Sequence, residues 1–202
     1  MKLMLTAFTA VAVIAAPSSA APVVGKPAPN FKLADVNGKP VTLSQFKGKI
    51  VVLEWNNPEC PFVKKHYSTG NMQKTQAAAR KDGAVWLTIN SSAPGKQGNV
   101  SGPQAKTIVA AQKAQPTAYL LDPQGVVGKT YAAKTTPHMY IVNKAGILAY
   151  AGGIDDKPTP NPADIRGARN HVLAALAELK AGKPVSIASS RPYGCNVKYK
   201  DS

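Results

Sequence analysis

The chain has 202 residues, of which 44% are hydrophobic, and its formal charge is +15 at pH 7. That length suits one domain with short appendages, and the apolar fraction excludes a generally disordered chain. The lysines are scattered instead of forming a dense run, which argues against nucleic-acid binding. The excess positive charge favours association with acidic partners, including peripheral contact with an anionic membrane surface.

Residues 1–20 have the pattern of a signal peptide. Lys2 precedes an apolar run over residues 3–16 that is short for a transmembrane helix, and residues 17–20 end in small side chains. We expect cleavage after Ala20 or Ala21 and a periplasmic or secreted mature protein. Retention of the segment as a membrane anchor is the alternative.

The first predicted element of the mature chain is a hairpin. Residues 31–33 and 41–43 are predicted to be short strands, because the Asn37-Gly38 pair between them is typical of a tight turn. Ser44 begins one helical turn, which ends before Gly48.

The central stretch is residues 50–67, IVVLEWNNPECPFVKKHY. Residues 50–55 form an apolar strand that ends at Trp55, and a helix begins at Pro61, since proline in the first turn costs no hydrogen bond. Cys60 then lies at or beside the helix N-cap, where unpaired N–H groups and the helix dipole favour a thiolate. The pattern predicts a redox nucleophile at Cys60; a buried, inert cysteine is the alternative.

Helices and strands alternate after this point. In chain order we predict a helix over 71–81, a buried strand over 84–89, a loop over 91–102, a helix over 103–113 capped by Ser101, a strand over 118–121, a helical turn over 124–131, strands over 138–142 and 147–150 joined by a hairpin, a last helix from Asn161 or Asp164 to Lys180, and a non-helical tail over 184–202. This order predicts an α/β three-layer sandwich with a mixed central sheet and flanking helices.

Three groups of residues resemble a known family. A strand is followed by Cys60-Pro61-Phe62-Val63, a strand is preceded by Thr136-Pro137, and a hairpin at residues 143–146 precedes the closing helix. On these residues the chain resembles the thioredoxin superfamily. Within it the chain is most similar to the peroxiredoxin-like (AhpC/TSA, redoxin) branch, on Cys60-Pro61-Phe62, Thr136-Pro137 and the segments 152–156, 181–185 and 194–199, the last of which contains Gly194-Cys195-Asn196. The resemblance implies a thioredoxin-like domain over residues 21–183, a tail over 184–202 that carries Cys195, and a cis peptide bond before Pro137 that faces Cys60.

The chain departs from the family pattern at two places. Val63 stands at the second cysteine position of the thioredoxin CxxC motif, so Cys60 cannot form a local disulfide there. Asn57 and Leu53 stand where a typical peroxiredoxin has a threonine or serine and a proline. The polar clamp that activates peroxide is therefore not evident.

The resemblance implies an antioxidant or thiol-dependent oxidoreductase that performs thiol–disulfide exchange or peroxide reduction without a cofactor. Cys60 and Cys195 would be the catalytic nucleophile and the resolving cysteine, although a purely structural disulfide between them is an alternative. Trp55, Pro61, Thr136 and Pro137 would position the substrate. The expected partners are a disulfide-containing protein or a peroxide, and an external thiol that supplies electrons.

Two other functions are compatible with the sequence. A copper-binding or metal-delivery protein of this fold could use Cys60, His66, His138 and Met139, which are soft or borderline ligands. His171, in the last predicted helix, is expected to be structural. A binding module that keeps the fold without redox chemistry is the third possibility.

Overall fold

The computed structural model describes residues 21–202, and the predicted signal peptide lies outside the described residues. The strands are β1 (Lys32–Asp35), β2 (Pro40–Thr42), β3 (Val51–Trp55), β4 (Val85–Asn90), β5 (Ala118–Leu121), β6 (Thr135–Thr136), β7 (His138–Val142), β8 (Leu148–Gly152) and β9 (Cys195–Asn196). The helices are α1 (Pro61–Ser68), α2 (Asn71–Lys81), α3 (Gly102–Ala111), α4 (Val126–Thr130) and α5 (His171–Lys180), with 3-10 helices η1 (Leu43–Phe46) and η2 (Pro162–Gly167).

A seven-stranded mixed sheet forms the centre of the molecule, in the order β2-β1-β5-β4-β3-β7-β8. Strands β3, β4 and β5 are parallel, because helices connect them as crossovers. Strand β7 runs antiparallel to β3 and forms a hairpin with β8. On the other side β1 pairs antiparallel with β5, and β2 forms the edge of the sheet. The predicted mixed α/β sandwich of thioredoxin type is confirmed.

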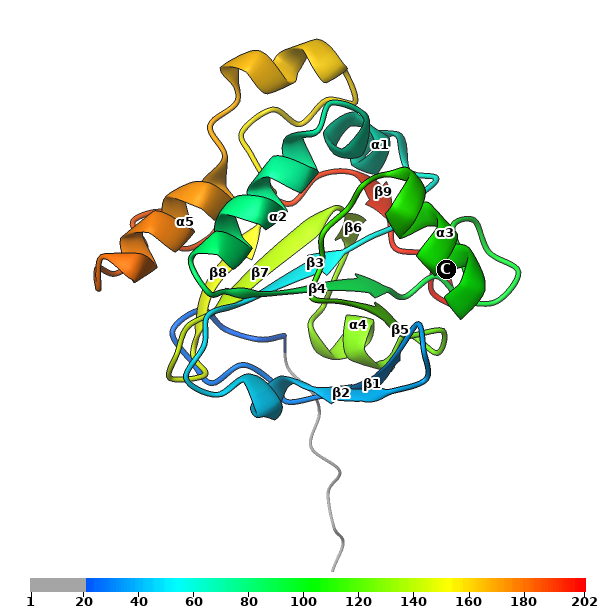
Figure 1. Ribbon diagram of the computed structural model, residues 1–202, viewed down its shortest axis with the longest axis horizontal. Coiled ribbons are helices and arrows are strands. Elements are labelled where there is room, and N and C mark those ends of the chain that lie inside the picture. Colours follow the sequence, from blue (N-terminus) through cyan, green and yellow to red (C-terminus); the bar gives the residue numbers. More distant parts are fainter. Residues whose placement is uncertain (1–20) are drawn as a thin grey trace, which may run out of the picture.

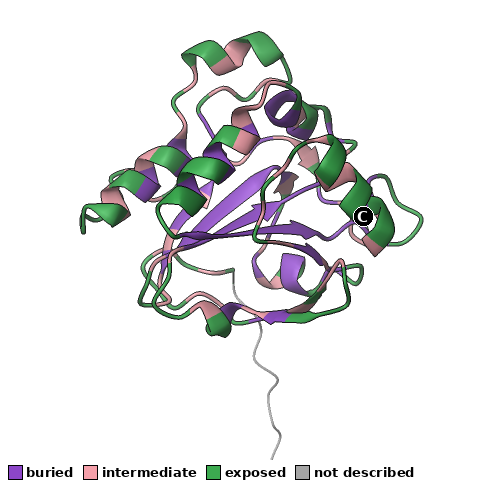
Figure 2. Ribbon diagram, viewed as in Figure 1, coloured by how far each residue is buried: buried purple, intermediate pink, exposed green. Residues whose placement is uncertain are grey.

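The sheet separates two apolar clusters. Along β3 the side chains alternate, so Val51, Leu53 and Trp55 face the cluster that also contains residues of the N-terminal hairpin and α4. Val52 faces the other cluster, which α1, α2 and α5 cover and which contains Cys60. Figures 1 and 2 show this arrangement, with helices on both sides of a sheet whose central strands are buried.

The start of the last helix differs from the prediction. The expected continuous helix from Asn161 or Asp164 to Lys180 is wrong, because η2 ends at Gly167 and α5 begins only at His171. The Asn170 side chain caps α5 by accepting a hydrogen bond from the Leu173 N–H at 2.9 Å. No helix within residues 21–202 is long and apolar enough to cross a bilayer.

Candidate functional site

Cys60 lies where the turn after β3 becomes helix α1. The Asn57 side-chain oxygen accepts a hydrogen bond from the Glu59 N–H at 2.9 Å, and the Cys60 N–H donates to the Asn57 carbonyl at 3.1 Å. Cys60 is the N-cap of α1 and Pro61 its first residue, as predicted. The sequence therefore folds into a compact turn that presents the sulfur at a helix N-terminus, where the helix dipole favours negative charge.

The loop before β7 forms the opposite wall of the site. The peptide bond between Thr136 and Pro137 is cis, as the resemblance implied. The Thr136 carbonyl lies 3.1 Å from the Cys60 sulfur and accepts a hydrogen bond from its thiol. Thr136 and Pro137 thus contribute backbone to the immediate surroundings of Cys60, whose side chain is fully buried.

The C-terminal tail brings the second cysteine to the first. Strand β9 pairs antiparallel with β6, and this register places Cys195 opposite Thr136. The Sγ atoms of Cys60 and Cys195 lie 2.7 Å apart, although 135 positions separate the residues in the chain, and both are free thiols. Cys195 is partly exposed, whereas Cys60 is not.

Gly194 permits the close approach of the tail to the site. Its φ is +134°, a conformation that other residues rarely adopt, and a Cβ there would lie 2.0 Å from the Thr136 carbonyl oxygen. Further contacts hold the tail beyond Cys195. The Val197 N–H donates to the Lys134 carbonyl at 3.0 Å, and the Tyr199 hydroxyl donates to the Ala133 carbonyl at 2.8 Å.

The electrostatics of the pair distinguish the two sulfurs. Burial, together with the hydrogen bond to the Cys60 sulfur and the charge of that sulfur, raises the pKa of Cys195 to about 12. Cys195 therefore keeps its proton at neutral pH. This arrangement can deliver one nucleophile and one proton donor to a sulfur or oxygen electrophile.

The structure places Trp55 in the core and not beside the sulfur atoms. Its indole N–H donates to the Ser91 hydroxyl at 3.1 Å, and its ring packs against Tyr131 and Tyr140 at centroid distances of 5.3 and 5.2 Å. This cluster lies on the face of the sheet opposite the cluster that contains Cys60.

The two histidines of the metal alternative have other partners. His66 hydrogen-bonds through Nε2 to the Tyr193 hydroxyl at 3.2 Å and through Nδ1 to the Asn71 amide at 2.8 Å. Nδ1 of His138 accepts a hydrogen bond from the Lys134 N–H at 3.3 Å. Burial lowers the pKa of His66 to about 4 and that of His138 to about 3, so both rings are neutral at pH 7.

A metal centre is not assembled from these side chains. Met139 is fully buried in the apolar cluster beneath α1, among core side chains. Within residues 21–202, no group of three or more His, Cys, Asp or Glu side chains gathers to hold an ion. The geometry gives the copper-binding alternative no support.

A buried carboxylate near the site was missed by sequence reasoning. Glu54 is fully buried on the α1 side of the sheet and accepts hydrogen bonds from five side chains, those of Asn56, Tyr67, Gln76, Trp86 and Thr88. Burial raises its pKa, while these hydrogen bonds act in the opposite direction. The sequence did contain a signal for this residue, because Glu54 interrupts an otherwise apolar strand. In the structure its five donors connect β3 to β4, α1 and α2.

A second missed carboxylate is Asp155, in the polar loop after β8. Its Oδ1 atom accepts hydrogen bonds from the Tyr193 hydroxyl and from the Lys157 N–H, the latter at 2.9 Å. Tyr193 is two residues before Cys195, so Asp155 anchors the tail close to the site. The sequence offered only the Asp155-Asp156 pair as a signal, without its distant partner.

Comparisons with known proteins identify the family of the chain and solved structures that share its fold. The sequence model of the AhpC/TSA family matches residues 24–151. A search of curated proteins found no match. A solved structure of an uncharacterized conserved protein from Geobacillus kaustophilus superposes with a TM-score of 0.74 at 29% identity, over 89% of this chain and 94% of that one.

Two further solved structures share the fold at lower identity. A hypothetical protein from Sinorhizobium meliloti 1021 has a TM-score of 0.74 at 24% identity, over 91% of this chain and 98% of that one. A putative thiol:disulfide interchange protein DsbE from Chlorobium tepidum has a TM-score of 0.56 at 22% identity, over 77% of this chain and 99% of that one.

Proposed function

Because the chain belongs to the AhpC/TSA family and has a thioredoxin-like fold, we propose that it is an exported thiol-dependent oxidoreductase. In this proposal the protein cycles between a Cys60–Cys195 dithiol and the corresponding disulfide. The observation that carries it is the 2.7 Å separation of the two sulfur atoms at the N-terminus of α1. Family and fold support the redox class, and the sulfur pair supports the choice of residues.

The reducing half-cycle uses both cysteines. The Cys60 thiolate attacks one sulfur of a substrate disulfide, so a Cys60 mixed disulfide forms and the other substrate sulfur leaves as a thiolate. Cys195 gives its proton to that leaving thiolate and then attacks the Cys60 sulfur. The Cys60–Cys195 disulfide forms, the second substrate thiolate leaves, and two electrons have passed to the substrate.

Cys195 is the resolving cysteine in this scheme because α1 offers no nearer thiol. Val63, at the second position of the CxxC pattern, is fully buried in the apolar cluster and acts as a packing residue. The tail supplies the second sulfur instead, through the pairing of β9 with β6. Thr136, Pro137 and Pro61 are the residues that shape the backbone around Cys60.

Disulfide exchange is favoured over peroxide reduction by the surroundings of Asn57. Its oxygen accepts from the Glu59 N–H, its amide donates to the Gln97 carbonyl at 3.3 Å, and Gly98 packs directly against it. These contacts occupy the polar atoms at the position where a peroxiredoxin activates peroxide. Attack of Cys60 on a peroxide would give a sulfenic acid, which Cys195 would convert to the same disulfide with loss of water.

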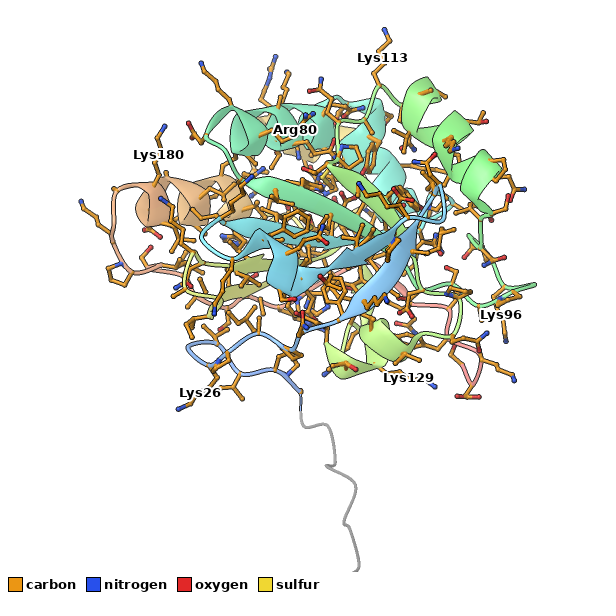
Figure 3. All side chains as sticks on the ribbon, turned by 60° about the horizontal axis from the view of Figure 1, so that its bottom comes forward. Lys26, Arg80, Lys96, Lys113, Lys129 and Lys180 are labelled. Atoms are coloured by element: carbon orange, nitrogen blue, oxygen red, sulfur yellow. The ribbon has the colours of Figure 1, made fainter. Side chains whose placement is uncertain are left out.

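Export and partners follow from the sequence pattern and the charge. The signal-peptide pattern of residues 1–20 supports a periplasmic or secreted protein, in which disulfide chemistry is sustained. The labelled side chains in Figure 3 (Lys26, Arg80, Lys96, Lys113, Lys129 and Lys180) project from several parts of the surface. This distribution suits general attraction to acidic partners or anionic lipid surfaces, together with a disulfide substrate and an external thiol reductant.

The test is the thiol state of the mature protein. Alkylation before and after reduction, with peptide mapping by mass spectrometry, should find a Cys60–Cys195 disulfide that forms with an oxidised dithiol and is lost with a mild reductant. Cys195→Ser should instead accumulate a mixed disulfide at Cys60. The proposal fails if both thiols stay unreactive. Rapid sulfenic acid at Cys60 under hydrogen peroxide, with slow disulfide exchange, would assign peroxidase activity instead.

A further inference from the structure

A cleft of 620 Å³ opens beside the cysteine pair. Phe62, Thr135, Gly194 and Asn196 line the end nearest the sulfurs, and the last two of these flank Cys195. The other end is lined by the loop after β8, the start of α5 and the tail before Cys195. The volume suits a small organic molecule.

Two buried polar atoms of this lining have no hydrogen-bond partner among residues 21–202. They are Oδ2 of Asp155, a residue that is 3% exposed, and Nδ1 of His171, a residue that is 9% exposed. Oδ1 of Asp155 is already satisfied by Tyr193 and Lys157. A buried carboxylate oxygen without a donor is costly, so Oδ2 of Asp155 is an acceptor available to a donor in the cleft.

The basic side chains around Tyr193, the residue that donates to Asp155, have hydrogen-bond partners of their own. Lys65 is buried, donates to the Lys157 carbonyl at 2.8 Å, and lies 5.6 Å from the centre of the Tyr193 ring. His66 is hydrogen-bonded to Tyr193 and to the Asn71 amide. The charged side chains that line the cleft are the carboxylates of Asp155 and Asp156 and the exposed guanidinium of Arg191. The deep part of the cleft is therefore complementary to a positive charge, although the whole chain carries +15.

We propose that this cleft binds a small thiol, or its disulfide, that carries an ammonium group. The ammonium group occupies the position next to Asp155 and His171, and the sulfur reaches Cys195. The inference rests on the proposed function and names the class of the external reductant. His171, which the sequence analysis treated as structural, becomes part of the binding site.

The reaction runs through Cys195, because this residue is partly exposed and both of its chain neighbours line the cleft, whereas Cys60 is fully buried. The thiolate of one ligand molecule attacks the Cys195 sulfur of the Cys60–Cys195 disulfide, and the Cys60 thiolate leaves. A second ligand thiolate attacks the ligand sulfur of the new mixed disulfide. Cys195 leaves as a thiolate and takes up a proton, the ligand disulfide is released, and two ligand thiols have supplied two electrons.

The net charge of the protein makes this a demanding prediction. A chain of +15 attracts anionic thiols and repels cationic ones at long range. Without a specific site, the order of reactivity would favour a carboxylate-bearing thiol over an ammonium-bearing one. A preference for the ammonium-bearing thiol therefore requires local recognition.

The experiment measures the rate at which three thiols reduce the Cys60–Cys195 disulfide. The probes are cysteamine, 2-mercaptoethanol and 3-mercaptopropionate, which carry an ammonium group, no charge and a carboxylate. Each reduction rate is divided by the thiolate concentration. It is then divided by the rate at which the same thiol reduces a small uncharged disulfide, which corrects for the intrinsic reactivity of that thiol. The ratio for cysteamine over 2-mercaptoethanol is expected to be about tenfold, since a charge-assisted hydrogen bond to a buried carboxylate is strong. Asp155→Asn should bring that ratio close to one.

Asp82→Asn is the matched control, because it removes the same charge from the exposed end of α2, outside the cleft. It should leave the ratio unchanged. A ratio of one or less in the wild-type protein overturns the proposal, and this measurement does not depend on the folding of any variant. Equal ratios in the two variants also overturn it. Failure of the proposed function is a different result, namely that no Cys60–Cys195 disulfide forms for any thiol to reduce.

Discussion

Gly194→Ala should weaken the Cys60–Cys195 disulfide without changing any atom of either cysteine. The new methyl group would lie 2.0 Å from the Thr136 carbonyl oxygen and 2.8 Å from its carbon. Both atoms belong to the backbone that also borders Cys60, so they have little room to move. The strand β9 has to shift, and Cys195 moves with it away from the position that the disulfide requires.

The magnitude follows from the backbone. A residue other than glycine at a φ of +134° is strained by about 1–3 kcal/mol, and the collision with Thr136 adds to this. Since each 1.4 kcal/mol is a factor of about ten in an equilibrium constant, the balance should shift toward the dithiol by roughly 10- to 100-fold. In the two-electron scale of disulfides, each factor of ten is about 30 mV.

The assay is equilibration of the protein with a graded redox buffer, followed by alkylation and mass spectrometry. The matched control is Gly182→Ala, because Gly182 also has a positive φ of +71° but has no atom within 4 Å of the added Cβ. Gly182→Ala should lower the stability of the fold and leave the dithiol–disulfide balance unchanged. A wild-type balance in Gly194→Ala would refute the view that β9 positions Cys195.

Three other outcomes are expected. Between pH 7 and pH 5 the free energy of unfolding should fall by about 2 kcal/mol more in the wild type than in His66→Gln. The pKa of His66 is about 4 in the folded protein and 6.5 ordinarily, so over this range the unfolded chain binds a proton that the folded protein does not. Urea unfolding at both pH values measures the two losses, and equal losses would contradict the prediction. Trp55→Phe should destabilise the fold by roughly 1–3 kcal/mol, because the hydrogen bond to Ser91 and part of the ring packing are lost. The alkylation rate of Cys60 in the dithiol form should stay unchanged. A large change in that rate would show that Trp55 acts on the cysteine site. The disulfide closes a loop across 135 positions, so the oxidised protein should be more stable than the dithiol by about 5 kcal/mol in guanidinium unfolding, and Cys195→Ser should show no such redox dependence.

Local chemistry made the start of the site predictable from the sequence. The β-forming run before Trp55, the turn residues after it and Pro61 together specify where α1 begins, and so they specify the place of Cys60. The same kind of signal failed in the last helix. The apolar spacing from Ile165 to Leu179 suggested one helix, but Asn170 caps a new helix in the middle of that pattern. Capping by a side chain outweighed periodicity there.

The long-range part of the site had no local signal. Glu54 is stabilised by donors from α1, α2 and β4, and no single stretch of sequence carries that set. The Asp155 carboxylate meets Tyr193 across 38 positions. The pairing of Cys195 with Cys60 could be suggested from the even number of cysteines in an exported chain and from the family resemblance, but spacing along the chain says nothing of how β9 meets β6.

The division of the redox pair between a helix start and the end of the chain affects which reactants can approach. Cys60 is fully buried beneath Cys195, and β9 already occupies the backbone edge of β6 beside the cis-proline loop. An extended polypeptide would have to displace β9 before it could pair with that edge or contact the Cys60 sulfur. In our proposal a small molecule in the adjoining cleft lies against Gly194 and Asn196, the neighbours of the partly exposed Cys195, with the tail in place. Large disulfide substrates therefore require release of the tail before they can react, whereas small thiols do not.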